Sequence, residues 1–237
     1  MTSPENPWKN ISWYNTIAEC DKTIVSECLA GSGKVKPETQ IHCELLPEPF
    51  IGDFNANVYL LSGNPGLSQM DFLYVFNKEL EAQLQETLLQ NPESHNPVHF
   101  MWLDNRGSNR VCATRHPGYE WWQRILSSIL PVNDNPRICD IEFYPYHSCN
   151  IPKFSEQLPS NAYVDYYIRE AIMKNKWIII LRCKKEWQDR IKELKTHKKL
   201  LYCSSAQNVC VTENNLVGLD GQKISKDTWN ALLEAMR

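Results

Sequence analysis

The sequence contains no apolar run long enough to cross a membrane. Its longest purely apolar runs, Trp177–Leu181 and Val58–Leu61, are far shorter than the roughly 20 residues that a spanning helix requires. The first eight residues, MTSPENPW, lack the basic start and the apolar stretch of a signal peptide. These absences predict a cytoplasmic protein that is neither secreted nor inserted into a membrane.

Cysteine pairs of the Cys-x-x-Cys type are also missing. The nine cysteines are an odd number scattered along the chain, whereas a zinc or iron–sulfur site needs clustered thiolates. We therefore expect reduced thiols, no metal and no other cofactor. The net charge of −3 excludes a polybasic coat for nucleic acid, but it leaves room for a local basic groove.

What the chain does contain is a series of short apolar runs that alternate with helix-like stretches. The pattern predicts strands at 57–62, 98–103, 138–143, 177–181 and 200–203. It predicts helices at 8–30, 70–90, 117–130, 161–174, about 184–197 and from 226 onward. Ser160 and Ser225 are expected to cap the helices that they precede. Strands that are nearly continuous apolar runs favour a mostly parallel sheet covered on both faces. We expect a single α/β domain with a helical extension over 1–46, a core over 47–215 and a C-terminal helix within 216–237.

Ligands of such sheets bind at the carboxyl ends of the strands, where the loops gather. The sharpest signal in these loops is Gly63-Asn64-Pro65-Gly66, directly after the strand expected at 57–62. Two glycines allow close approach of the backbone, and Pro65 favours an extended conformation at Asn64, whose amide offers both donors and an acceptor. The alternative is an ordinary turn between a strand and a loop, because all of these residues are common in turns.

Two stretches carry a resemblance to a known family. Ser62-Gly63-Asn64-Pro65-Gly66-Leu67-Ser68 looks like a Gly-x-Asn-Pro-Gly-Leu-Ser element, with Ser62 in place of the first glycine. His116-Pro117-Gly118-Tyr119-Glu120-Trp121-Trp122 looks like a His-Pro-x-x-x-Phe-Trp stretch that opens a helix. Both elements belong to the uracil-DNA glycosylase superfamily, and the chain resembles its mismatch-specific, thymine-DNA glycosylase-like branch over roughly residues 50–215.

The resemblance implies a three-layer α/β/α sandwich around a mainly parallel, four-stranded sheet. It also implies that Asn64 holds the water that attacks the sugar. An amide is too weak to act as a general base, so Asn64 would orient this water by hydrogen bonding. Further residues would contact the flipped base and its surroundings: Gly63, Pro65, Gly66, Leu67, Tyr144, Tyr146 and His147. The alternative for the two tyrosines is packing in the core, and for His147 a structural role.

Contacts with nucleic acid are expected from two further segments. The residues concerned are Ser204, Ser205, Gln207 and Asn208, together with Arg182 and Lys184. Short polar groups after a strand suit phosphate or sugar contacts, and the segment 182–199 is locally basic. The alternatives are a loop whose polar groups bond to one another and an ordinary solvated helix face.

Three functions are consistent with these features. The leading hypothesis is a monomeric DNA glycosylase-like hydrolase that removes a damaged, mismatched or modified base by base flipping and water attack at the anomeric carbon. The second is a catalytically silent member that binds nucleic acid or a protein, because Ser204-Ser205 stands where uracil-removing members carry His-Pro-Ser. The third is an N-glycosidic hydrolase of free nucleosides or nucleotides.

Overall fold

The computed structural model describes residues 3–30, 36–91, 98–103, 116–154, 156–205 and 207–237. Its centre is one six-stranded sheet with the strand order β1-β3-β2-β4-β5-β6. The four central strands are β3 (Ile138–Ile141), β2 (Val58–Leu61), β4 (Trp177–Ile180) and β5 (Leu200–Cys203), and all neighbours among them pair in parallel. The edge strands β1 (Phe50–Gly52) and β6 (Leu216–Val217) pair antiparallel. The α/β class is therefore confirmed, with a mixed sheet of six strands where four were expected.

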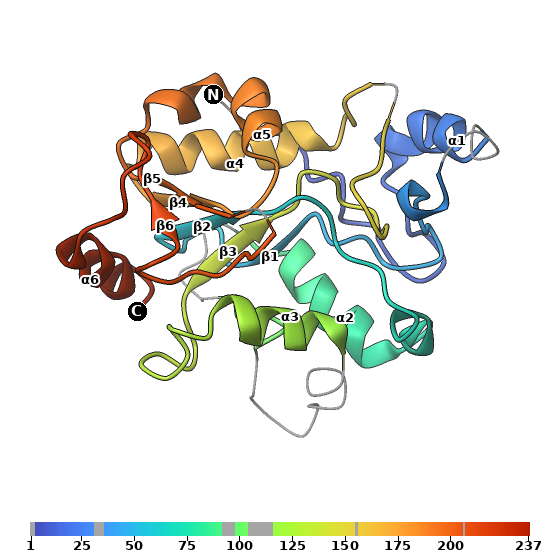
Figure 1. The fold of residues 1–237 in the computed structure, drawn as a ribbon. Coiled ribbons are helices and arrows are strands. Elements are labelled where there is room, and N and C mark those ends of the chain that lie inside the picture. Colours follow the sequence, from blue (N-terminus) through green and yellow to red (C-terminus); the bar gives the residue numbers. More distant parts are fainter. Residues whose placement is uncertain (1–2, 31–35, 92–97, 104–115, 155, 206) are drawn as a thin grey trace.

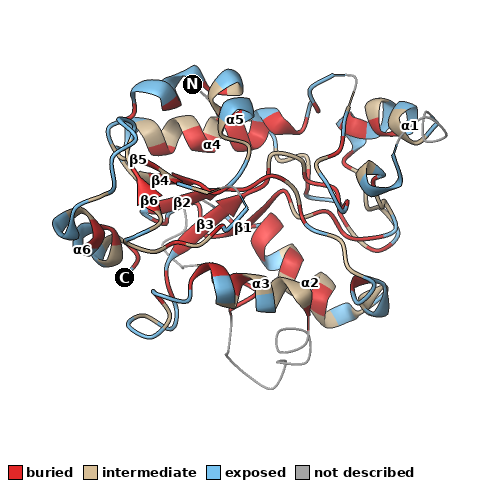
Figure 2. Cartoon of the chain, in the orientation of Figure 1, coloured by how far each residue is buried: buried red, intermediate tan, exposed pale blue. Residues whose placement is uncertain are grey.

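Helices lie on both faces of this sheet (Figure 1). On one face lie α4 (Asn161–Met173) and α5 (Lys184–Arg190), and on the other lie α2 (Lys78–Leu88) and α3 (Pro117–Ile125). The buried residues gather in the strands and on the helix sides that face them (Figure 2). Because helices pack on both faces of the sheet, the side chains of the central strands are buried on both sides, which explains why these strands are almost continuously apolar.

The helix ends agree only in part with the expected ones. Ser225 caps α6 (Lys226–Ala235) by accepting a hydrogen bond from the Thr228 N–H. Ser160 precedes α4 but makes no cap bond, because its hydroxyl donates to Asp21 instead. The long helices expected at 70–90 and 184–197 are each divided, with the 3-10 helices Asp71–Tyr74 and Lys192–Thr196 beside α2 and α5.

The prediction of a strand at 98–103 is wrong. Residues Phe100–Leu103 are buried, but they form turns and belong to no strand. The physical reason is that β1 occupies the open edge of β3, and Trp102 instead packs against α3, where its ring lies within 3.1 Å of the position that a Cβ on Gly118 would take. Burial alone explains the apolar composition of this run.

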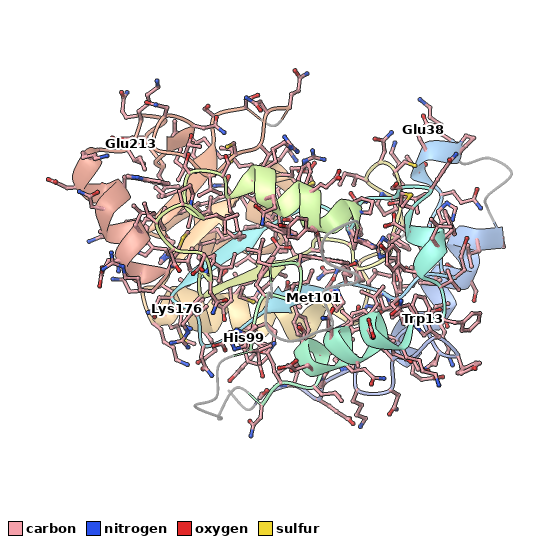
Figure 3. The ribbon with its side chains drawn as sticks, turned by 90° about the horizontal axis from the view of Figure 1, so that it is seen from below. Trp13, Glu38, His99, Met101, Lys176 and Glu213 are labelled. Carbon is pink, nitrogen blue, oxygen red and sulfur yellow. The ribbon has the colours of Figure 1, made fainter. Side chains whose placement is uncertain are left out.

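The prediction of one helix over 8–30 is also wrong for most of its length. Only Lys22–Ala30 is helical (α1), preceded by the 3-10 helix Glu19–Asp21, and a further 3-10 turn covers Pro37–Thr39. In the first residues, side chains compete with a helix for the backbone: Asn6 Oδ1 accepts from the Trp8 N–H, and Asn15 Nδ2 donates to the Asn10 carbonyl. Trp13 is held beside α2 through bonds to Glu81 and Asn77 (Figure 3).

Two further findings concern membrane-spanning helices and cysteines. Within the described ranges, no helix is long and apolar enough to span a membrane. The eight described cysteines are free thiols, and Cys112 lies outside the described residues.

Candidate functional site

A cavity lies at the carboxyl edge of the parallel strands, where the chain changes direction across the sheet. From β2 the chain returns to β3 on one side, and from β3 it crosses to β4 on the other side of β2. Such a switch point leaves a crevice outside the strand ends, which is where open α/β sheets bind ligands. A cavity of about 230 Å³ occupies this position. Seven residues predicted from the sequence line it: Gly63, Asn64, Pro65, Gly66, Leu67, His147 and Arg182.

The turn after β2 is held tightly on both sides. A Cβ on Gly63 would lie 2.6 Å from Ile151 Cδ1 and 3.2 Å from Cys183 Sγ, so a larger residue here would displace these side chains, whereas nothing lies within 4 Å of a Cβ on Gly66. The Gly63 carbonyl accepts a hydrogen bond from the Tyr144 N–H at 3.0 Å. On the other side, Trp187 Nε1 of α5 donates to the Ser62 carbonyl at 2.8 Å. The start of the turn at Ser62 and Gly63 is therefore part of the packed core, while Gly66 at its end is exposed.

The side chain of Asn64 is fixed by the loop after β3. Its Nδ2 lies 2.8 Å from the Ser148 carbonyl, 3.0 Å from Ser148 Oγ and 2.9 Å from the Pro65 carbonyl. Two of these partners only accept, so the nitrogen must face them and the oxygen must point elsewhere. Among the described residues, none donates a hydrogen bond to Asn64 Oδ1. Asn64 thus presents an oriented acceptor in the wall of the cavity.

His147 is buried behind this turn and has both ring nitrogens facing acceptors. Its Nδ1 lies 2.8 Å from the Gly66 carbonyl, and its Nε2 lies 3.5 Å from Glu48 Oε1. Burial acts to lower the pKa of His147, but the nearby Glu48 carboxylate, the Gly66 carbonyl and Asp71 outweigh it and raise the pKa. The imidazole therefore links the Asn64 turn to the segment before β1, where its Nε2 faces the Glu48 carboxyl group.

A second histidine, His116, also lines the cavity and pairs with Asp71. His116 Nδ1 accepts from the Gly118 N–H and so caps α3, which leaves Nε2–H to face Asp71 Oδ1 at 3.2 Å. Burial lowers the pKa of His116 and raises that of Asp71. The His116 ring stacks on Trp102 with centroids 4.3 Å apart. Both histidines that contact the cavity are therefore held in fixed orientations.

Two buried carboxyl groups lie at the end of β3. Asp140 is fully buried and accepts a 2.6 Å hydrogen bond from Ser62 Oγ, while its Oδ2 has no described partner. Glu142 follows two residues later and lines the cavity. Burial raises the pKa of Asp140 to about 8 and raises that of Glu142 well above its ordinary value. Sequence reasoning missed Glu142, and also Glu48 and Asp71, because no local pattern marks them.

Two arginines lie against Trp121 of the cavity lining, and one of them, Arg182, lines the cavity itself. The guanidinium groups of Arg182 and Arg124 lie 4.8 and 4.5 Å from the centre of the Trp121 ring, and both arginines are exposed. In the described part of the chain neither arginine forms an ion pair. Lys184 does not line this cavity, because its ammonium group lies over the Tyr202 ring on β5.

Tyr146 does not lie beside the cavity as predicted. It is 1% exposed, its hydroxyl donates to Asp21 Oδ2 at 2.9 Å, and it accepts from the Ala18 N–H. Its role is to attach the N-terminal segment to the loop after β3. Tyr144 also lies outside the cavity lining and packs between the rings of Phe143 and Phe154. The packing alternative considered for both tyrosines agrees with these contacts.

The polar loop after β5 is bonded mainly to itself. Ser204 Oγ donates to Asn215 Oδ1 at 2.7 Å, and Ser205 Oγ accepts from the Asn208 N–H. The side chain of Asn215 in turn donates to the Asn208 carbonyl. None of the four predicted residues of this loop, Gln207 included, lines the cavity. The structure therefore does not bring this loop together with Asn64.

The site as a whole combines a small volume with several fixed polar groups. Pockets for drug-sized ligands typically measure ~300–1,000 Å³, so a cavity of about 230 Å³ suits a single small ring system. Within the described residues, no cluster of three or more histidine, cysteine or acidic side chains could hold a metal ion. The fixed polar groups of the site can form hydrogen bonds, transfer protons and orient water.

Comparisons with known proteins found no relative of this chain. No family model matches the chain, and neither a curated protein nor a solved structure matches it.

Proposed function

We propose that the protein hydrolyses the N-glycosidic bond of a DNA nucleotide whose base has flipped into the cavity. The observation that carries this proposal is the Asn64 carboxamide, whose Nδ2 is fully engaged while Oδ1 remains an oriented acceptor in the cavity wall. An acceptor of this kind can hold a water molecule in position to attack the anomeric carbon. The gain comes from orientation, because an amide does not remove the proton of the water.

A uracil-DNA glycosylase-like fold is part of this proposal. The Asn64-Pro65-Gly66 turn follows the first of the four parallel strands, and His116-Pro117 opens α3 some fifty residues later. Both elements, which carry the resemblance to that superfamily, contribute to the lining of one cavity at the expected edge of the sheet. Two independent sequence elements that meet at a single site support common ancestry of the fold and of the reaction.

The other residues of the site then have distinct tasks. Flipping a nucleotide costs a few kcal/mol, which contacts inside the cavity and with the strand must offset. His147 acts as a positioning residue, because it bonds the Gly66 carbonyl and keeps the turn in place. Arg182, exposed at the mouth, is suited to a phosphate of the DNA strand. The partner is DNA, and a monomer is sufficient for this arrangement.

The test is base release from labelled oligonucleotides that contain uracil, mismatched thymine, hypoxanthine, or oxidised or modified pyrimidines. Wild-type protein should generate abasic sites on at least one of them. Asn64→Ala should lower the rate by about 10²-fold or more, which is the scale of losing one well-placed polar group. Asn230→Ala serves as the matched control, because Asn230 is exposed on α6. Unchanged base release in Asn64→Ala would remove Asn64 from the mechanism.

A second candidate function is binding of nucleic acid without cleavage. It is favoured by the loop after β5, which has no histidine and whose Ser204 hydroxyl bonds to Asn215. Retention of DNA with no abasic sites on any substrate would support this reading. Activity confined to free nucleosides or nucleotides would instead support a monomer hydrolase.

A further inference from the structure

Glu142 is the one acidic residue at the end of β3 that the cavity reaches. It is 9% exposed, and its Oε2 is sealed from solvent with no hydrogen-bond partner among the described residues. The charged and titratable groups near it are Asp140 on β3, Glu48 from the segment before β1, and Arg182 and Cys183 after β4. Two of these four are carboxyl groups, Cys183 is a thiol whose pKa is raised by burial, and the one cation, Arg182, is exposed to solvent.

An ionised Glu142 would be strongly disfavoured in this position. Its buried oxygen would carry negative charge without a donor, and the neighbouring carboxyl groups would repel that charge. The side chain is therefore held as a neutral acid, and burial accordingly raises its pKa well above the ordinary value. Carboxylic acids kept neutral by an apolar or acidic environment serve enzymes as proton donors at near-neutral pH.

We propose that Glu142 donates a proton to the departing base, an inference that rests on the proposed glycosidic hydrolysis. In this step the bond between the anomeric carbon and the base nitrogen breaks, and its electron pair stays with the base. The Glu142 proton moves to the base, which leaves as a neutral molecule. The oxygen of the water held by Asn64 bonds to the anomeric carbon and releases one proton to solvent, from which the Glu142 carboxylate is reprotonated. The sum is sugar–base plus water giving sugar–OH plus base–H.

The donor also limits the class of base. Because Oε2 is sealed, only the other carboxyl oxygen can reach a base, and in the neutral acid it presents an O–H donor, which matches a ring nitrogen that is an acceptor. Cytosine and its modified forms have such a nitrogen, which can accept the proton. Uracil and thymine present N3–H instead, so they have no ring nitrogen there to protonate. The geometry thus points to a cytosine-type base over a uracil-type base.

The experiment compares the full-length wild type with Glu142→Gln, which keeps the size and a donor but has no proton to release. Single-turnover base release is measured across pH on oligonucleotides with a cytosine-type or a uracil-type base in the same sequence. The wild-type rate on the cytosine-type substrate should be highest at low pH and fall as Glu142 ionises. Glu142→Gln should lose about 10²–10⁴-fold and show no such fall. Glu86→Gln, an exposed position on α2, is the matched control and should behave as wild type.

The outcomes separate this inference from the proposed function. If Asn64→Ala abolishes base release while Glu142→Gln keeps the wild-type rate and pH profile, Glu142 is not the donor and the hydrolase stands. If uracil-type bases are released faster than cytosine-type bases, the substrate class is wrong. If no substrate is cleaved, the proposed function fails, and equilibrium binding then tests whether Glu142 recognises the base. A wild type that does not prefer cytosine-type oligonucleotides, or a preference that is unchanged in Glu142→Gln, overturns the role of Glu142.

Discussion

The buried Asp140 beneath the cavity predicts an unusual dependence of stability on pH. Its pKa is raised from 3.8 to about 8, chiefly because burial disfavours the charged form. The folded protein therefore holds a proton on Asp140 that the unfolded chain releases, and stability is lost as pH rises through this window. At ~1.4 kcal/mol per pH unit, the loss is on the order of 5 kcal/mol for this one group.

Asp140→Asn isolates the effect. Asparagine has the same shape, can still accept the hydrogen bond from Ser62 Oγ and does not ionise. Urea unfolding at about pH 5 and about pH 8 should show that the wild type loses ~4 kcal/mol more than Asp140→Asn over this interval. Glu142 is present in both proteins, but the charge of Asp140 contributes to its raised pKa, so the difference between the slopes reports on Asp140 together with its effect on Glu142. Equal slopes for the two proteins would refute the assignment of a neutral carboxyl group at this position.

Two further predictions concern the mouth of the cavity and the N-terminal segment. Arg182→Gln should reduce the steepness of the plot of log affinity for DNA against log salt concentration by ~0.7–0.9, the value expected for one lost phosphate contact. Lys185→Gln should leave this slope unchanged, because Lys185 pairs with Asp189. An affinity that does not depend on salt would exclude phosphate contact. Tyr146→Phe should cost ~1–3 kcal/mol of stability, seen as a lower Tm, because it removes a donor from a buried carboxylate. Base release should remain at the wild-type level, and a selective loss of activity would instead place Tyr146 in the site.

The central strands could be read from the sequence because their environment leaves a clear pattern. A parallel strand covered on both faces is apolar throughout, as in Val58–Leu61 and Trp177–Ile180. The edge strands β1 and β6 have three and two residues, too few for any periodicity to be visible. The run at 98–103 carries the same apolar signal as a strand, because the sequence reports burial and does not report which edge of the sheet is free.

The site was predictable only where its residues are adjacent in the chain. The turn at Gly63–Gly66 combines glycine, asparagine and proline, and each has a conformational reason to be there. Glu48 and Asp71 reach the cavity from other segments through contacts with His147 and His116. Such pairs depend on the tertiary fold, and neither carboxyl group has a sequence neighbour that identifies its partner. The position of Tyr146 could not be predicted for a different reason, since an aromatic residue in a loop near the site can equally pack in the core.

The charge balance of the cavity ties these findings to the proposed reaction. Of the four acidic groups that the described residues place near it, Glu48 lies against His147 and Asp71 faces His116, while burial raises the pKa of Asp140 and Glu142 and so favours their neutral forms. The interior therefore presents little net charge, which suits an uncharged nucleobase, while the exposed arginines at the mouth suit the anionic strand to which that base is attached. A cavity built for a free nucleotide would need to place positive charge inside, next to the phosphate. The separation of a neutral interior from a cationic rim thus favours a base presented by a polymer.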